Sequence, residues 1–189
     1  HKVSYKKIIN SISKSVKATT SPILILLFVG ALSGTWLISG IIPAMIYYGL
    51  QIFHPLFFLP ACLIICAIIS ISTGSSWTTS ATIGIAMIGI GKAMEINTGI
   101  VAGAILSGAY FGDKLSPLSD TTNLAAAMAN SNLFNHIRYM TLTTVPSIVI
   151  SLLFFILIGL FQVTTEDINN RFLFSSIEEK FFINPILFV

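Results

Sequence analysis

The sequence contains a stretch from Ala18 to Gly91 in which no Asp, Glu, Lys or Arg occurs. About 20 consecutive apolar residues suffice for one membrane-spanning helix, so this stretch has room for more than one. Two further charge-free stretches follow, Ile96–Gly112 and Tyr139–Thr165. Charged residues make up 9% of the 189-residue chain, far below the level of soluble proteins. The sequence therefore predicts an all-α, polytopic membrane protein with about five or six membrane segments, some of them discontinuous.

Lysine residues are concentrated at the amino terminus, where five of the ten basic residues lie in the first 17 positions. Lys and Arg that flank the first membrane span tend to remain in the cytoplasm, which predicts a cytoplasmic amino terminus. The same clustering accounts for the net charge of +3 without nucleic acid as a partner. Ile8, Ile12 and Val16 recur every four residues, so residues 1–20 are predicted to form an amphipathic segment on the membrane surface.

The remaining chain divides into three predicted regions. Residues 21–161 are predicted as the membrane core, 162–180 as a polar loop or surface helix, and 181–189 as the start of a further membrane segment. The apolar stretch Ser21–Phe53 is too long for one straight span and contains Gly40 and Pro43, which predicts a break near Ser39–Pro43. Because the sequence stops inside an apolar stretch, we expect it to be a portion of a longer membrane protein.

Two short polar segments interrupt the apolar sequence, and each contains a glycine. In Ser70–Thr82 nine of the thirteen residues carry a hydroxyl group, and Gly112–Asn123 combines two aspartates with Pro117. Non-helical backbone survives at membrane depth only where protein or water satisfies its polar groups. Transporters use such breaks to present helix ends and free carbonyls to ions near the bilayer midplane. The two segments therefore indicate a candidate ion-binding site.

The chemistry of these two segments suits a monovalent cation and a proton. The first segment offers hydroxyl and carbonyl oxygens but no ionisable group, whereas the second contains Asp113 and Asp120. Hard cations prefer oxygen ligands, and one carboxylate among neutral oxygens balances the charge of Na⁺. A partly desolvated carboxylate also holds a proton more readily than one in water. One carboxylate could thus carry either ion, and we favour Asp120, which lies past Pro117 at the start of a predicted helix.

Simpler roles for the same residues stay open at this point. Ser and Thr in membrane helices often donate back to the carbonyl one turn earlier, which only eases packing. Asp120 also suits the N-cap of the helix that follows it, and Asp113 beside Lys114 suits an interfacial ion pair of little energetic value. Trp77 is either an interfacial anchor or the wall of a cavity.

Small residues indicate where helices could pack closely. Three pairs of glycines lie four residues apart, a spacing that lets helices approach one another in lipid. These pairs are Gly30 and Gly34, Gly99 and Gly103, and Gly108 and Gly112. Cys62 and Cys66 have the same spacing on an apolar segment with no other metal ligand nearby, so we expect them to be packing residues.

The polar segments resemble those of a known transporter family. The sequence GAYFGDKLSPLSDTTNLAAA at Gly108–Ala127 is similar to the signature of the NhaC-type sodium/proton antiporters, and TGSSWTTSATIGIAMIGIG at Thr73–Gly91 is similar to their hydroxyl-rich segment. The segment GALSGTW at Gly30–Trp36 is also similar to the sequences of this family. The resemblance implies a multi-pass transporter of the cytoplasmic membrane, embedded in the lipid bilayer, that exchanges Na⁺ for H⁺. It implies neither an enzyme nor a cofactor beyond these transported ions, and it leaves homo-oligomerisation open.

The resemblance also implies which residues bind or couple the ions. Those that match the aspartate motif are Asp113, Ser116, Ser119, Asp120, Thr121, Thr122 and Asn123. Those that match the hydroxyl segment are Thr73, Ser75, Ser76 and Thr78. The division of roles among them is a prediction from their chemistry, in which these oxygens surround Na⁺ and no residue is catalytic.

Three alternative functions remain at the level of the sequence. The first is an exchanger of the same family that couples Na⁺ and H⁺ to malate or lactate, for which Lys114 and Arg138 are the few available cations. The second is an intramembrane serine hydrolase with His54 or His136 as its base, although the chain lacks the G-x-S-x-G turn of serine hydrolases. The third is a channel, which a flux insensitive to an imposed pH gradient would indicate.

Overall fold

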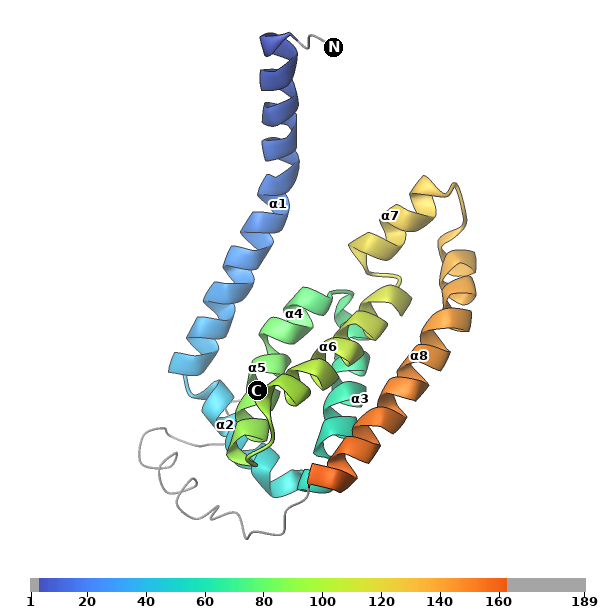
Figure 1. The fold of residues 1–189 in the computed structure, drawn as a ribbon. Helices are drawn as coiled ribbons and strands as arrows, with labels where there is room; N and C mark the ends of the chain where they lie inside the picture. Colours follow the sequence, from blue (N-terminus) through green and yellow to red (C-terminus); the bar gives the residue numbers. More distant parts are fainter. Residues whose placement is uncertain (1–3, 163–189) are drawn as a thin grey trace.

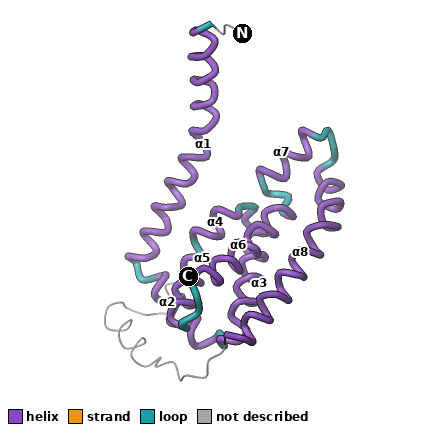
Figure 2. The backbone as a smooth tube through the Cα atoms, viewed as in Figure 1, coloured by secondary structure: helices purple, strands orange, loops and turns teal. Residues whose placement is uncertain are grey.

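The computed structural model describes residues 4–162, and every regular element in this range is a helix (Figure 2). The all-α prediction is therefore confirmed. The predicted final segment 181–189, and all of the loop 162–180 except Gln162, lie outside the described residues. The helices are α1 (Tyr5–Ile38), α2 (Ile41–Ile52), α3 (Pro55–Thr73), α4 (Ser76–Ala81), α5 (Ile83–Ala93), α6 (Thr98–Leu115), α7 (Asp120–Met128) and α8 (Leu133–Gln162).

Two of the described helices, α3 and α8, are long and apolar enough to cross a membrane. A third span is present if the two bent pieces Leu26–Ile38 and Ile41–Ile52, which meet at 68°, form one broken crossing. Counted over the described residues, this number is smaller than the five or six segments expected for the whole chain, which included discontinuous ones and the stretch 181–189. The physical reason is that the polar breaks divide the middle of the chain, so that α5, for example, has 11 residues.

The break between α1 and α2 occurs where the sequence predicts it. Gly40 adopts φ 87°, a left-handed conformation that suits glycine, and the chain turns there from one helix into the next. No break occurs at the predicted boundary near residue 20, because α1 continues through it as one helix. Thr20 Oγ1 donates to the Val16 carbonyl at 2.9 Å and so stays within the helical hydrogen-bond pattern.

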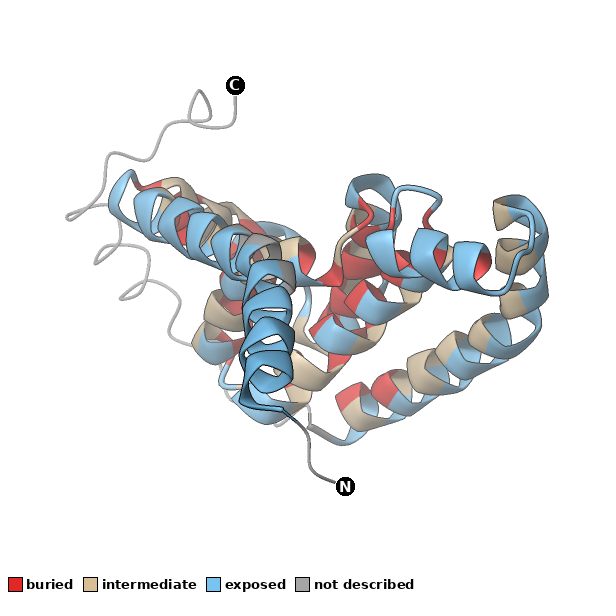
Figure 3. Cartoon of the chain, turned by 90° about the horizontal axis from the view of Figure 1, so that it is seen from above, coloured by how far each residue is buried: buried red, intermediate tan, exposed pale blue. Residues whose placement is uncertain are grey.

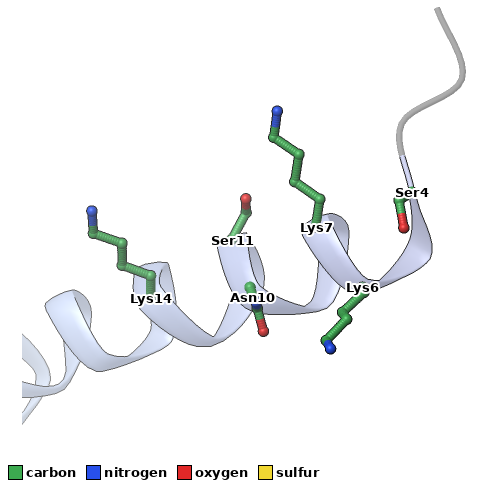
Figure 4. Close-up of a pocket in the computed structure, with 6 residues that line it drawn as sticks. All are labelled: Ser4, Lys6, Lys7, Asn10, Ser11 and Lys14. Atoms are coloured by element: carbon green, nitrogen blue, oxygen red, sulfur yellow. The ribbon is translucent and has the colours of Figure 1, made fainter.

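The amino-terminal half of α1 extends beyond the other helices (Figure 1). Lysine side chains project from it together with polar residues (Figure 4). Ile8, Ile12 and Val16 are 44%, 53% and 61% exposed, so no described helix covers this apolar face. The face keeps the amphipathic character that the sequence indicates, and its position on the membrane surface stays a prediction.

The core forms where α3 packs against α6, and buried residues gather around this pair (Figure 3). A Cβ at Gly108 would collide with the Leu63 carbonyl, and a Cβ at Gly112 would collide with the Ala67 carbonyl. The two backbones therefore lie closer than any residue with a side chain would allow. Buried residues around them include Phe58, Leu59, Cys62, Leu63, Cys66, Met87, Ile90, Val101, Ala104 and Ile105.

Glycine spacing alone does not identify such contacts. At Gly30 and Gly34 no atom of another described residue lies within 4 Å of the place that a Cβ would occupy, and at Gly103 a Cβ would meet only the ring of Phe155, at 3.6 Å. The close approach predicted from glycine pairs is thus found at Gly108 and Gly112. The packing role predicted for Cys62 and Cys66 is confirmed, because both are fully buried in the core.

Candidate ion-binding site

The first polar segment breaks the helical path at Gly74 and Ser75. Gly74 has φ +71°, and a Cβ there would collide with the backbone of Leu118, so both the conformation and the space require glycine. Ser75 is the N-cap of α4, and its hydroxyl oxygen accepts a hydrogen bond from the Thr78 amide at 3.2 Å. The sequence therefore ends α3 and starts a short second helix within two residues.

The second polar segment breaks the path between α6 and α7. Ser119 is the N-cap of α7 and accepts from the Thr122 amide at 3.4 Å, so the cap lies one residue before Asp120. Asn123 Nδ2 donates to the Pro117 and Ser119 carbonyls, both at 2.8 Å. The Asn123 side chain thus gives the Pro117 carbonyl a partner at the break, whereas the Ser119 carbonyl also accepts the helical bond from the Asn123 amide at 3.0 Å. The Asp120 carboxylate is left free of the capping role.

Hydrogen bonds join the two breaks to each other. Ser116 Oγ, fully buried, donates to the Ile71 carbonyl in the last turn of α3 at 2.7 Å. In the opposite direction, Ser76 Oγ at the start of α4 donates to Asp113 Oδ2 in the last turn of α6 at 3.2 Å. The two interrupted segments, separated by about forty residues of sequence, thus form one structural unit.

A cleft of about 340 Å³ opens at this junction. It is lined by Leu26, Gly74, Ser75, Ser76, Trp77, Asp113, Ser119, Asp120 and Thr121. Trp77 therefore forms part of a cavity wall, one of the two roles open to it from the sequence. The lining contains two carboxylates and, among the described residues, no Lys, Arg or His, so its charge favours a cation.

The two aspartates differ in burial. The sequence led us to expect Asp120 to be the deeper of the two, but the structure buries Asp113 instead. Asp113 is 8% exposed and accepts the hydrogen bond from Ser76, whereas Asp120 is exposed. Lys114, which could have paired with Asp113, is exposed and lies in a different cleft. Successive residues of a helix point about 100° apart, so burial of Asp113 turns its neighbour away. Of the two carboxylates, Asp113 is therefore the one that the structure encloses.

The other candidate residues support the breaks without lining the cleft. Thr122 Oγ1 donates to the Asp113 and Lys114 carbonyls, both at 3.2 Å, and so caps the end of α6. Thr78 Oγ1 donates to Ser75 Oγ at 3.1 Å, and Thr73 Oγ1 lies 3.4 Å from Thr79 Oγ1. Candidates in this supporting group are Thr73, Thr78, Ser116, Thr122 and Asn123.

One contributor to the cleft was not identified from the sequence. Leu26 of α1 lines it, although Leu26 lies within an ordinary apolar stretch. A second long-range contact supports the same placement of α1, because Ser33 Oγ donates to the Ala81 carbonyl at the end of α4. A residue of this kind carries no signal in the sequence, since only the packing of α1 against α4 brings it to the site.

Comparison with known proteins agrees with the motifs. Residues 108–185 match the Na⁺/H⁺ antiporter family. The chain is 46% identical over 183 residues to the malate-2H⁺/Na⁺-lactate antiporter of Bacillus subtilis, covering 96% of this chain and 39% of the relative. It is 41% identical over 185 residues to the Na⁺/H⁺ antiporter NhaC of Alkalihalophilus pseudofirmus, covering 98% and 40%. No solved structure matches the chain.

A third relative is named for solutes other than those of the first two relatives. The chain is 39% identical over 160 residues to the arginine/ornithine antiporter ArcD of Halobacterium salinarum, covering 85% of this chain and 33% of the relative. Compared with the first two relatives, the chain spans about two fifths of their length. The resemblance inferred from the two polar segments is confirmed, and the chain is a relative of the Na⁺/H⁺ antiporter family.

Proposed function

We propose that this chain forms the ion-binding part of a secondary active transporter that exchanges Na⁺ for H⁺ across the cytoplasmic membrane. The observation that carries this proposal is the cleft at the two helix breaks, where buried Asp113 is surrounded by hydroxyl groups and no basic side chain of the described residues lines the wall. The relatives named above are antiporters, which supports a transporter rather than an enzyme.

In the proposed mechanism the Asp113 carboxylate binds Na⁺ when ionised and H⁺ when neutral. Oxygen atoms of Ser75, Ser76, Ser119 and Thr121 line the same cleft and would supply neutral ligands for Na⁺. Asp120 at the exposed side of the cleft adds negative charge that attracts cations towards it. Because one carboxylate serves both ions, binding of one excludes the other, and alternating access then moves them in opposite directions.

Competition at one carboxylate predicts a specific pH dependence of Na⁺ binding. Where Asp113 is mostly protonated, each Na⁺ that binds displaces one proton, so the apparent Kd for Na⁺ should rise about tenfold for each unit by which pH falls. Binding of ²²Na⁺ to the complete purified protein across a pH series measures this slope. A Kd that stays constant across the acidic range would contradict the shared carboxylate.

The orientation of the chain gives a second prediction. The Lys-rich end of α1 should be cytoplasmic, because basic residues beside a first span are retained on that side. In a variant with Cys62 and Cys66 replaced by Ala, a cysteine introduced at Lys7 should resist a membrane-impermeant maleimide in intact cells and react after permeabilisation. Full labelling in intact cells would show that the amino terminus lies outside the cell, contrary to this prediction.

A second candidate function is exchange of an organic acid coupled to Na⁺ and H⁺. The names of two relatives favour it, since malate, lactate, arginine and ornithine all carry a carboxylate group. Uptake of labelled malate or lactate into proteoliposomes that contain the complete protein distinguishes this function from simple Na⁺/H⁺ exchange.

A further inference from the structure

A second polar cleft lies between α6 and α8, on a different face of α6 from the Asp113 cleft. Its volume is about 280 Å³. The residues that line it are Ser107, Tyr110, Phe111, Lys114, Thr143, Thr144, Ser147, Ile148 and Ser151. Six of these nine side chains carry a hydroxyl group and one carries an ammonium group, and the described lining contains no carboxylate. The cleft is therefore the electrostatic opposite of the site around Asp113.

The hydrogen bonds in this cleft show which of its groups are available to a ligand. The hydroxyls of Ser107, Thr144 and Ser147 donate to carbonyls of their own helices at 2.7, 2.8 and 2.8 Å. The Tyr110 and Ser151 hydroxyls and the Lys114 ammonium have no hydrogen-bond partner among residues 4–162. The Lys114 ammonium can only donate, and the Tyr110 and Ser151 hydroxyls can donate as well as accept, so all three groups can bind a hydrogen-bond acceptor.

The position of the polar residues on α8 also argues against a purely structural role. Thr144, Ser147 and Ser151 recur at helical spacing on one face of α8, whereas Val145, Val149 and Leu153 on another face are exposed apolar residues suited to lipid. Polar groups within a membrane helix face protein or a water-filled cavity rather than lipid. The α8 hydroxyls therefore mark the side of the helix that faces away from lipid, towards protein or an aqueous or ligand-filled space.

Helix α6 places opposite charges in the two clefts through adjacent residues. Asp113 faces α4 and its hydroxyls, and Lys114, about 100° further round the helix, lines the cleft with α8. A transported cation and a transported anion could thus occupy sites on one rigid helix. A volume of about 280 Å³ lies just below the range of pockets for drug-sized ligands, so the cleft has room for an anion of a few carbon atoms.

We propose that the cleft between α6 and α8 binds the carboxylate of a small organic anion, with Lys114 as its counter-ion and the Tyr110 and Ser151 hydroxyls as further donors. This inference rests on the second candidate function and assigns it a site. It does not involve the ligands of Na⁺. A charge-assisted bond from an ammonium to a carboxylate supplies most of the attraction, and the hydroxyl donors orient the anion.

Direct binding of labelled malate and labelled lactate to the complete purified protein tests the inference. We expect saturable binding of at least one of them, weakened at least about tenfold by Lys114→Met and about threefold by Ser151→Ala. Lys114→Arg retains the charge and should keep most of the affinity. Lys92→Met removes a lysine at the end of α5, outside both clefts, and should leave binding unchanged.

The outcomes separate this inference from the functions on which it depends. Saturable binding that Lys114→Met and Ser151→Ala leave unchanged would overturn the site while the organic-acid function stands. Absence of saturable binding of either anion to the wild type, in protein that still binds ²²Na⁺, would overturn both the site and the organic-acid function. If Lys114→Met is not recovered as folded protein, Ser151→Ala alone tests the site. Weakened anion binding by this variant supports the site, and unchanged binding overturns it.

Discussion

Replacing Asp113 by Asn is expected to abolish Na⁺/H⁺ exchange, with a loss of at least about a hundredfold in rate. Asn keeps the size of the side chain and one oxygen ligand, but it can neither release a proton nor balance the charge of Na⁺. The bond from Ser76 Oγ can still form with the amide oxygen, so the junction of the two breaks should survive. Proteoliposomes with an internal pH dye and an imposed Na⁺ gradient measure the exchange.

Asp120→Asn is the matched control, because it changes the second carboxylate of the same cleft. Asp120 is exposed and makes no described hydrogen bond through its side chain, so we expect its loss to weaken Na⁺ attraction and leave the exchange rate within about tenfold of the wild type. If instead Asp120→Asn is inactive and Asp113→Asn is active, Asp120 is the carboxylate that binds both ions. Normal exchange by both variants would remove the carboxylate mechanism altogether.

Gly112→Ala is expected to prevent stable folding, with a loss of at least about 3 kcal/mol in the free energy of unfolding. The added methyl group would collide with the Ala67 carbonyl and the Ser70 side chain, and neither can move without separating α3 from α6. The intrinsic helix propensity of Ala, about 1 kcal/mol better than Gly, is too small to compensate. Thermal denaturation and size-exclusion chromatography in detergent measure the effect.

Gly34→Ala provides the control for this prediction. Gly34 has the same four-residue spacing to another glycine, but a Cβ there meets no atom within 4 Å among the described residues. The substitution should therefore be neutral or stabilising by up to about 1 kcal/mol through helix propensity alone. Equal loss of stability in both variants would show that the glycines matter for conformation rather than for the contact between α3 and α6.

Much of the fold was accessible from the sequence because lipid imposes simple rules. Charge-free stretches identified a helical membrane protein. Gly40 lies at the break predicted near Ser39–Pro43, and Gly74 lies at the break predicted from the hydroxyl-rich segment. Helix boundaries were less accessible. The sequence suggested a boundary near residue 20, where the composition changes from basic to apolar, but a change of composition does not interrupt backbone hydrogen bonds and α1 continues.

The sequence predicted most residues of the candidate site but not how they are arranged in space. Hydroxyl groups and aspartates in two breaks identified most of the lining, because carboxylates are rare at membrane depth and a dense cluster of hydroxyl residues stands out in an apolar sequence. The burial of Asp113 rather than Asp120 depends on how α6 is rotated against α4, and an error of one residue in that rotation exchanges a buried side chain for an exposed one. Leu26 reaches the site only through the packing of α1, which leaves no mark in the local sequence.

Hydrogen bonds between α3 and the end of α6 hold these two segments in one fixed arrangement. Ser70 Oγ donates to the Ala109 carbonyl at 2.5 Å and Ser116 Oγ to the Ile71 carbonyl at 2.7 Å, on either side of the contact at Gly112. Sliding or parting these helices would break both bonds and the backbone contact together. In the proposed exchange mechanism we therefore expect α3 and α6 to move together as one body. Access of ions to the cleft would then depend on elements that move against this pair, and we expect α1, which ends at the bend at Gly40 and contributes Leu26 to the cleft wall, to be one of them.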